Sequence, residues 1–113
     1  MTSPITTHVL DISLGRPAQG ITVILQMQAG AEWKEIARGV TSPEGRLADL
    51  LAPGKFARGT YRLRFETGLY FAARQAASFY PYVEVTFDVT DAAQHFHVPL
   101  LVTPYSYTTY RGS

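Results

Sequence analysis

Apolar residues recur at every second position in several separate stretches of this chain, and this period limits the fold more than any other feature. A period of two places alternate side chains on opposite faces of an extended strand, so that one face is apolar and becomes buried. Four runs show the pattern most clearly: Ile21, Val23 and Leu25; Tyr61, Leu63 and Phe65; Val83, Val85, Phe87 and Val89; and Phe96, Val98, Leu100 and Val102. The runs predict an all-β sandwich or barrel.

Turn-forming residues separate these runs at intervals typical of an all-β domain. The segment Ser42-Pro43-Glu44-Gly45 is the most informative of them, because Ser at the first position, Pro at the second and Gly at the fourth suit a type I turn. We therefore expect Arg46 to follow a tight reversal with its side chain held in a fixed direction.

The remaining segments complete the predicted architecture. Residues 69–76 interrupt the alternation, are rich in alanine and contain neither Gly nor Pro, which predicts one short helix. The last nine residues carry Tyr105, Tyr107 and Tyr110, which is unusual for a free polar tail, so we expect this end to be docked. No repeat, low-complexity tract or linker divides the chain. Residues 1–113 are thus predicted to form a single domain, in which oligomerisation would add to a modest stability margin.

Composition and charge exclude several classes of protein. A formal net charge of +1 provides no broad basic surface for nucleic acid or an anionic membrane, so we expect neither as a partner. The absence of cysteine excludes thiolate metal sites and cysteine nucleophiles. Positions 1–7 lack the basic and apolar regions of a secretory signal, which favours a cytoplasmic protein. A precursor with an export signal removed ahead of Met1 stays open as an alternative.

Three histidines, His8, His95 and His97, are the obvious candidates for proton transfer near neutral pH. His95 and His97 are two positions apart on a predicted strand, so both face outward if Phe96 and Val98 face the core. Histidines on strands are more often structural or solvated than catalytic, and the residues alone leave function open. A three-histidine zinc site is a further alternative. The sequence contains no Gly-X-Ser-X-Gly elbow and no phosphate-binding glycine loop.

Four motifs resemble one known family over essentially the whole length of the chain. They are Thr7-His8-Val9-Leu10-Asp11, Glu44-Gly45-Arg46, His95-Phe96-His97-Val98-Pro99-Leu100-Leu101 and the terminal Tyr110-Arg111-Gly112-Ser113. In this order they are similar to the transthyretin-like 5-hydroxyisourate hydrolases. The departures are mild: Glu44 stands where Asp is usual, Phe96 where Tyr is usual, and Tyr82 follows Pro81 where Glu is common.

The resemblance implies a sandwich of two four-stranded sheets with one short helix, assembled as a homotetramer from two dimers. The implied reaction is hydrolysis of 5-hydroxyisourate to 2-oxo-4-hydroxy-4-carboxy-5-ureidoimidazoline in urate breakdown, by attack of water on a ring carbonyl. The residues that match the family's catalytic groups are His8, Arg46, His97 and Ser113. Those that would shape the substrate pocket are Tyr110, Arg111 and Gly112.

The resemblance also sets the alternatives. We expect no cofactor and no metal ion, and we assign His95 a supporting hydrogen bond at most. Ser113 could contribute its hydroxyl and its α-carboxylate. Transthyretin shares the fold but lacks the combination of histidines, arginine and terminal tetrapeptide, so a small-molecule carrier without catalysis is one alternative. A metal-dependent hydrolase that uses His8, His95 and His97 is the other.

Overall fold

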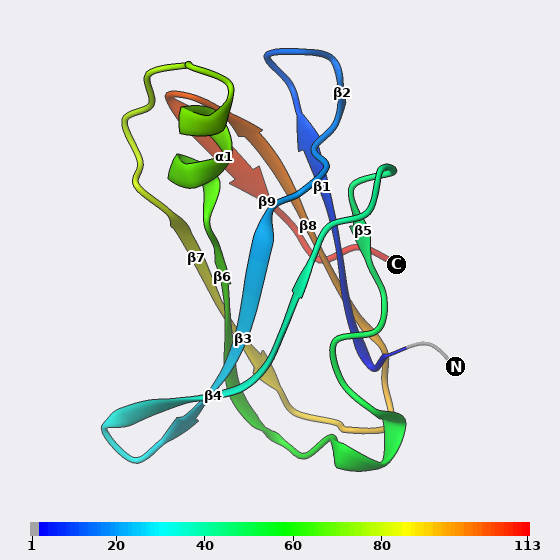
Figure 1. The fold of residues 1–113 in the computed structure, drawn as a ribbon. Coiled ribbons are helices and arrows are strands. Elements are labelled where there is room, and N and C mark those ends of the chain that lie inside the picture. The colour runs from blue at the N-terminus through cyan, green and yellow to red at the C-terminus, as the bar shows by residue number, and fades with distance from the viewer. Residues whose placement is uncertain (1–2) are drawn as a thin grey trace.

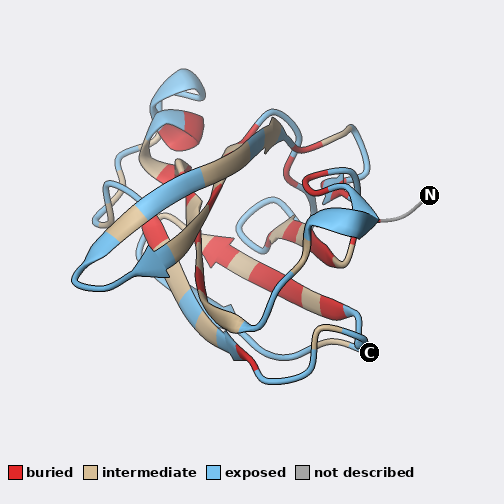
Figure 2. Cartoon of the chain, turned by 90° about the horizontal axis from the view of Figure 1, so that it is seen from below, coloured by how far each residue is buried: buried red, intermediate tan, exposed pale blue. Residues whose placement is uncertain are grey.

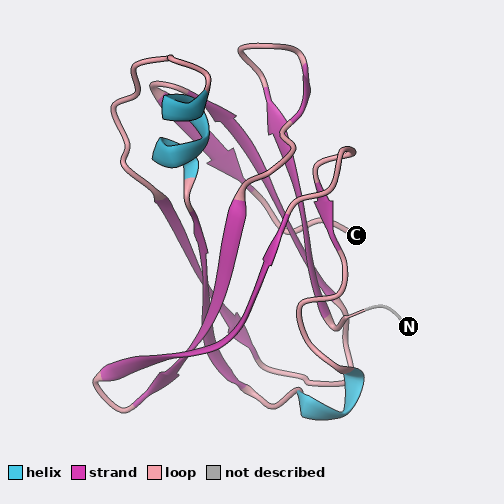
Figure 3. Ribbon diagram, in the orientation of Figure 1, coloured by secondary structure: helices cyan, strands magenta, loops and turns pink. Residues whose placement is uncertain are grey.

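The computed structural model describes residues 3–113 as two packed β-sheets with one α-helix (Figure 1, Figure 3). The first sheet contains β1 (Ile5–Asp11), β2 (Arg16–Pro17), β5 (Arg46–Leu47), β8 (Phe96–Thr103) and β9 (Ser106–Thr109). The second contains β3 (Thr22–Ala29), β4 (Glu32–Val40), β6 (Gly59–Phe65) and β7 (Val83–Val89). Helix α1 spans Thr67–Ala73 and a 3-10 turn, η1, spans Pro53–Lys55. Across residues 3–113, no helix has the length and apolar character that a membrane crossing requires.

The all-β sandwich is confirmed, and two details differ from the expectation. The first sheet has five strands instead of four because two-residue strands, β2 and β5, both pair with β1. Such short pairings leave no periodic trace in a sequence. The helix begins at Thr67 and ends at Ala73, whereas the alanine-rich composition suggested about 69–76. Gln75 adopts a left-handed conformation with φ of 58°, which cannot continue a helix.

One strand pairing joins the two ends of the chain. In the described structure β1 and β8 are the only parallel neighbours, and all other pairings are antiparallel. Their register places Thr6 opposite His97 and His8 opposite Pro99. Figure 1 shows β1 (blue) and β8 (orange) side by side, with the C-terminus close to β5. Residues about ninety positions apart in the sequence therefore meet on one face of the first sheet.

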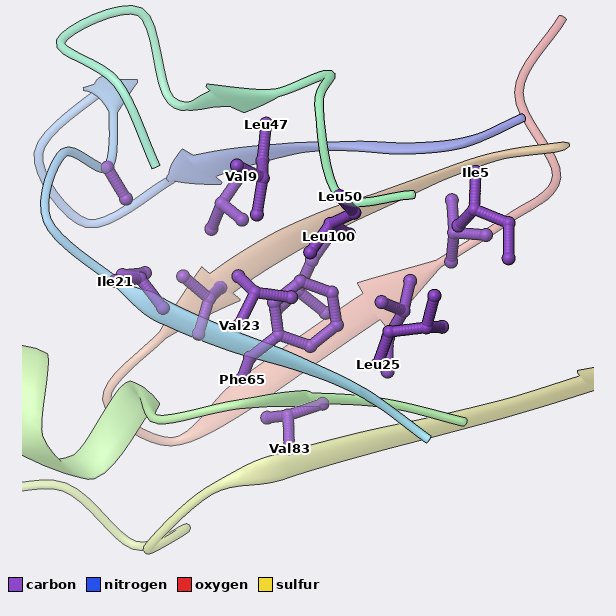
Figure 4. Packing of buried hydrophobic residues seen from close by; sticks show 14 of the residues in the cluster. Ile5, Val9, Ile21, Val23, Leu25, Leu47, Leu50, Phe65, Val83 and Leu100 are labelled. Atoms are coloured by element: carbon purple, nitrogen blue, oxygen red, sulfur yellow. The ribbon is translucent and has the colours of Figure 1, made fainter. Parts of the chain in front are cut away.

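The alternating apolar runs form the core between the sheets. Val23, Leu63, Phe65 and Leu100 are completely buried, and Figure 4 shows side chains of β1, β3, β6 and β8 directed into the space between the layers. Figure 2 shows buried residues alternating with less buried ones along the strands, while the tip of the β3–β4 hairpin is exposed. The core faces predicted from the period of two are confirmed.

A buried carboxylate ties α1 to the end of β1. Asp11 is 1% exposed; its Oδ1 accepts hydrogen bonds from the Ser13 hydroxyl and the Leu14 amide, and its Oδ2 accepts one of 2.8 Å from the Tyr70 hydroxyl. Burial, followed by the bond to Asp11, raises the pKa of Tyr70 to about 12. The protonated Tyr70 hydroxyl is therefore one of the three hydrogen-bond donors to the buried Asp11 carboxylate.

Replacing Tyr70 with phenylalanine is expected to lower the free energy of unfolding by about 1–3 kcal/mol, because the buried Asp11 carboxylate loses a donor. Urea unfolding at pH 7 measures the change. Tyr105→Phe, which removes a hydroxyl from a side chain that is 66% exposed, is the control. The folded pKa of Tyr70 lies above its ordinary value of 10.0, so the wild-type advantage should persist below pH 10 and fade between 10 and 12. Equal stability of both variants would contradict this role.

Candidate active site

The turn before β5 fixes the start of Arg46. The Gly45 amide donates a hydrogen bond of 2.8 Å to the Ser42 carbonyl, and Gly45 has φ of 76°, a left-handed conformation that favours glycine. The Arg46 amide then donates to the Ser42 hydroxyl oxygen over 3.2 Å. Strand β5 pairs with β1 so that Arg46 lies opposite His8. The predicted tight turn is thus confirmed, and it delivers Arg46 to the outer face of the first sheet.

His8 supports this turn through its imidazole ring. Its Nε2 lies 2.9 Å from the Glu44 carbonyl oxygen. Because a carbonyl oxygen can only accept, Nε2 must carry the proton of this hydrogen bond. In a neutral ring, Nδ1 is then the nitrogen with a lone pair. His8 is half-buried and lies between β5 and β8, opposite Arg46 on one side and Pro99 on the other.

His97 is the half-buried histidine of β8. It lies between the buried residues Phe96 and Val98, so it faces away from the core as expected. Its Nδ1 lies 2.8 Å from the Thr6 hydroxyl oxygen. Burial is the largest cause that lowers the pKa of His97, and the neighbouring His95, His8 and Arg46 lower it further. A neutral imidazole at pH 7 can accept a proton, which is what a general base requires.

A pocket of about 250 Å³ opens over this face of the first sheet. It is lined by Thr6, Thr7, Arg46, Ala48, His95, His97 and Ser113. Three of the expected catalytic residues, Arg46, His97 and Ser113, therefore meet in one concavity. His8 does not line it and lies instead beneath the turn that carries Arg46.

The end of the chain is docked through its backbone. The Gly112 amide donates a hydrogen bond of 2.8 Å to the His97 carbonyl oxygen, and the two residues form a β-bridge. Tyr110 and Arg111 line a separate, mostly apolar pocket of about 260 Å³ next to β7. The Arg111 guanidinium lies 4.6 Å above the Phe96 ring. The terminal tetrapeptide is thus divided between two pockets: Tyr110 and Arg111 line the apolar one, and Ser113 lines the one that contains His97. Tyr110 is 58% exposed.

Replacing Gly112 with alanine is expected to displace the His97 ring and to lower kcat on the order of tenfold or more. A Cβ at this position would lie 2.5 Å from Cδ2 of His97 and 3.3 Å from Cγ of Pro99, well inside the ~3.5–4.0 Å optimum for carbon atoms. Gly54→Ala is the matched control, because a Cβ there meets nothing within 4 Å. Wild-type turnover of Gly112→Ala would show that the His97 ring does not depend on Gly112.

Sequence reasoning missed Thr6, whose hydroxyl lies between two imidazoles, 3.1 Å from Nε2 of His95 and 2.8 Å from Nδ1 of His97. Its only local signal was a shared strand face with His8, because the contact depends on the register of the parallel pairing. No three His, Asp or Glu side chains within residues 3–113 are arranged to hold a metal ion. The three histidines bond instead to Thr6 and to the Glu44 carbonyl.

Comparison with known proteins shows which family this chain resembles. The model of the HIUase/Transthyretin family matches residues 5–112. A protein from Mus musculus named 5-hydroxyisourate hydrolase is 50% identical over 113 residues, which cover 98% of this chain and 96% of that protein. A protein of the same name from Halalkalibacterium halodurans is 45% identical over 119 residues, with both chains covered completely.

Solved structures show the same fold on both branches of this family. The 5-hydroxyisourate hydrolase of Klebsiella pneumoniae superposes with a TM-score of 0.85 at 37% identity, covering 96% of this chain and 98% of that one. Sea bream transthyretin in complex with thyroxine superposes with a TM-score of 0.93 at 30% identity, covering 97% and 95%. The backbone alone therefore does not separate an enzyme from a carrier, and the pocket must do so. The chain belongs to the HIUase/Transthyretin family.

Proposed function

We propose that this chain hydrolyses 5-hydroxyisourate, opening its ring to give 2-oxo-4-hydroxy-4-carboxy-5-ureidoimidazoline in urate breakdown. One observation carries the proposal: a neutral imidazole, a guanidinium and a terminal serine line the same pocket. The names of relatives at 45–50% identity support the same substrate. A carrier needs no proton acceptor beside a cation, whereas hydrolysis of a cyclic amide needs both.

His97 is the general base in this proposal. Its Nδ1 is engaged by Thr6, and its Nε2 makes no hydrogen bond with residues 3–113, so Nε2 is the atom that takes a proton from water. The water oxygen bonds to the ring carbonyl carbon, the carbon–nitrogen bond of the ring breaks, and the departing nitrogen receives a proton. Arg46 stays charged and stabilises the negative charge that develops on the carbonyl oxygen.

The other candidate residues position His97 and Arg46 or contact the substrate. We assign proton abstraction to His97 over His8, because Nε2 of His8 is bonded to Glu44 and His8 does not line the pocket. His8 holds the turn that positions Arg46. Ser113 offers its hydroxyl to the substrate from the opposite side. Arg111 anchors the segment that ends in Gly112 and Ser113, because it donates a hydrogen bond of 2.8 Å to Gln94, and Tyr110 lines the neighbouring pocket.

The pH profile of kcat/KM should rise from acid to neutral pH with a midpoint below 6.5. The pKa of His97 is lowered from its ordinary value of 6.5, so the neutral, base-competent ring is lost only when the pH falls through that lower value. Steady-state rates between pH 5 and 8 check this. A midpoint above 6.5 would contradict His97 as the base.

A direct assay tests the function. Freshly generated 5-hydroxyisourate is mixed with the protein, its near-ultraviolet absorbance is followed, and the spontaneous decay is subtracted. We expect saturable acceleration that persists after dialysis against a chelator. Loss of activity on chelation, restored by a divalent metal, would support the metal-dependent alternative. Decay equal to the blank together with saturable thyroxine binding would make the chain a carrier.

We also propose that the protein assembles as a homotetramer made of two dimers. The edges of the two sheets formed by β7 and β9 are open, and unpaired strand edges favour pairing with another chain. Large apolar side chains are exposed on the surface, among them Leu14, Phe79 and Tyr105. Analytical ultracentrifugation should give four times the chain mass of 12.5 kDa. A species of one chain mass at micromolar concentration would refute the assembly.

A further inference from the structure

A single hydroxyl group connects the proposed base to a second imidazole. Thr6 Oγ1 lies 2.8 Å from Nδ1 of His97 and 3.1 Å from Nε2 of His95. Thr6 is 6% exposed, and its position is fixed by β1. His95 is exposed and lies just before β8. The Thr6 hydroxyl thus connects the half-buried His97 ring to the His95 ring at the protein surface.

The protons available to these groups restrict how they can be arranged. The Thr6 hydroxyl has one proton and two lone pairs, so it can donate to only one of the two rings and accepts from any ring to which it does not donate. If His97 is to present a lone pair at Nε2, its proton must lie on Nδ1 and be donated to Thr6. The proton of Thr6 can then be donated to Nε2 of His95, in the tautomer in which that nitrogen is an acceptor. This arrangement leaves a lone pair on Nε2 of both histidines.

We propose that Thr6 relays a proton from His97 to His95, so that His95 carries the positive charge that forms when water attacks the substrate. When Nε2 of His97 takes the water proton, Nδ1 gives its proton to Thr6 and Thr6 gives its own to Nε2 of His95. His97 is then neutral with a proton on Nε2, which it donates to the departing ring nitrogen. The relay reverses as this happens and restores the starting state, so no proton is gained or lost. The inference rests on the proposed hydrolysis.

The surroundings of the two rings favour this direction of transfer. His97 is half-buried and faces His8 from β1 and Arg46 from β5, both of which disfavour a second positive charge there. The other titratable groups at the pocket are the His95 ring itself and, at the end of the chain, the α-carboxylate of Ser113. His95 also lines a second pocket of about 430 Å³ on its far side, whose remaining residues are Ser3, Pro4, Pro53, Ala92, Ala93 and Gln94. Among residues 3–113 no cationic side chain lines that pocket, so a charge on His95 is better solvated and less opposed.

Paired substitutions at Thr6 test the relay. Thr6→Val keeps the shape of the side chain but removes the hydroxyl, and Thr6→Ser keeps the hydroxyl. We expect Thr6→Val to lower kcat about tenfold to hundredfold with little change in KM, and Thr6→Ser to stay within about threefold of wild type. The acid limb of the Thr6→Val pH profile should also move to lower pH, because the charged His97 ring loses a hydrogen bond. Equal kcat values for the two variants would overturn the relay.

Chemical rescue tests His95 separately, on an exposed residue whose removal leaves the core unchanged. We expect His95→Ala to lose kcat by a factor similar to that of Thr6→Val, and added imidazole to restore much of it. Pyrazole has nearly the same size and is a far weaker base, so it should not rescue. Wild-type kcat in His95→Ala, or equal rescue by both compounds, would mean that His95 does not carry the proton.

A spectroscopic measurement separates this proposal from the function itself. Nitrogen-15 chemical shifts of the histidine rings, measured near pH 8 without substrate, should show a proton on Nδ1 of His97 and none on Nε2 of His95. The opposite tautomers would overturn the relay whatever the protein hydrolyses. If the wild type did not accelerate 5-hydroxyisourate decay, the proposed function would fail, while these shifts would still report whether the hydrogen-bonded chain exists.

Discussion

Replacing His97 with glutamine is expected to lower kcat for 5-hydroxyisourate by about 10²–10⁴-fold, the usual cost of losing a general base. Glutamine is close to imidazole in reach and can still hydrogen-bond to Thr6, but it cannot accept a proton near neutral pH. The substrate should therefore bind with a similar KM while the chemical step slows. The acid limb of the pH profile should disappear from the residual activity, because the group that titrates there has been removed.

The structure supplies the control for this substitution. His97 is half-buried and lies on the outer face of β8, so the change should leave the packed core intact. Thermal unfolding of wild type and variant should confirm this within a few degrees. A folded His97→Gln protein with kcat within about threefold of wild type would remove His97 from the mechanism and leave His8, which lies opposite Arg46, and His95, which lines the pocket, as the other imidazoles.

Replacing Arg46 with alanine is expected to lower kcat/KM by about 10²–10³-fold, comparable with the loss of one donor from an oxyanion hole. The turn held by Ser42 and Gly45 aims this guanidinium at the pocket that contains His97. Lysine keeps the charge but not the planar fork of donors, so Arg46→Lys should recover only part of the loss. Progress curves at several substrate concentrations separate kcat from KM.

An exposed arginine outside the pocket provides the matched control for Arg46. Arg58 lies between η1 and β6 and does not line the catalytic pocket, so Arg58→Ala changes the net charge by the same amount. We expect it to keep kcat/KM within about twofold of wild type. Equal losses in Arg46→Ala and Arg58→Ala would mean that the net charge of the protein matters, and not a contact in the pocket.

Much of the fold could be predicted from local patterns. Each run with a period of two became a strand with its apolar face in the core, because the pattern itself decides which face is buried. Strand β4 was not among the predicted runs, since it is exposed or only partly buried along its length and has no apolar face to reveal it. The two-residue strands β2 and β5 were missed for a similar reason.

The candidate site was less accessible to local reasoning. Arg46 could be placed because the four residues before it specify a turn. The contact of Thr6 with His97 and the bond from His8 to Glu44 could not, since they depend on which strands become neighbours and in which register. The family resemblance gave Arg46, His97 and Ser113, which meet in the pocket, and His8, which does not line it. It did not give the hydroxyl that joins two of the histidines.

The parallel pairing of β1 with β8 also determines when the pocket can form during folding. Thr6 and His97 are 91 positions apart, so the chain must close a loop of nearly its whole length before they meet. Such high contact order slows folding, and recovery of activity should follow the slow refolding phase and not an early collapse. Backbone amides of both strands should exchange with deuterium only through global unfolding. Any core substitution that raises the unfolded fraction would then lower activity in the same proportion.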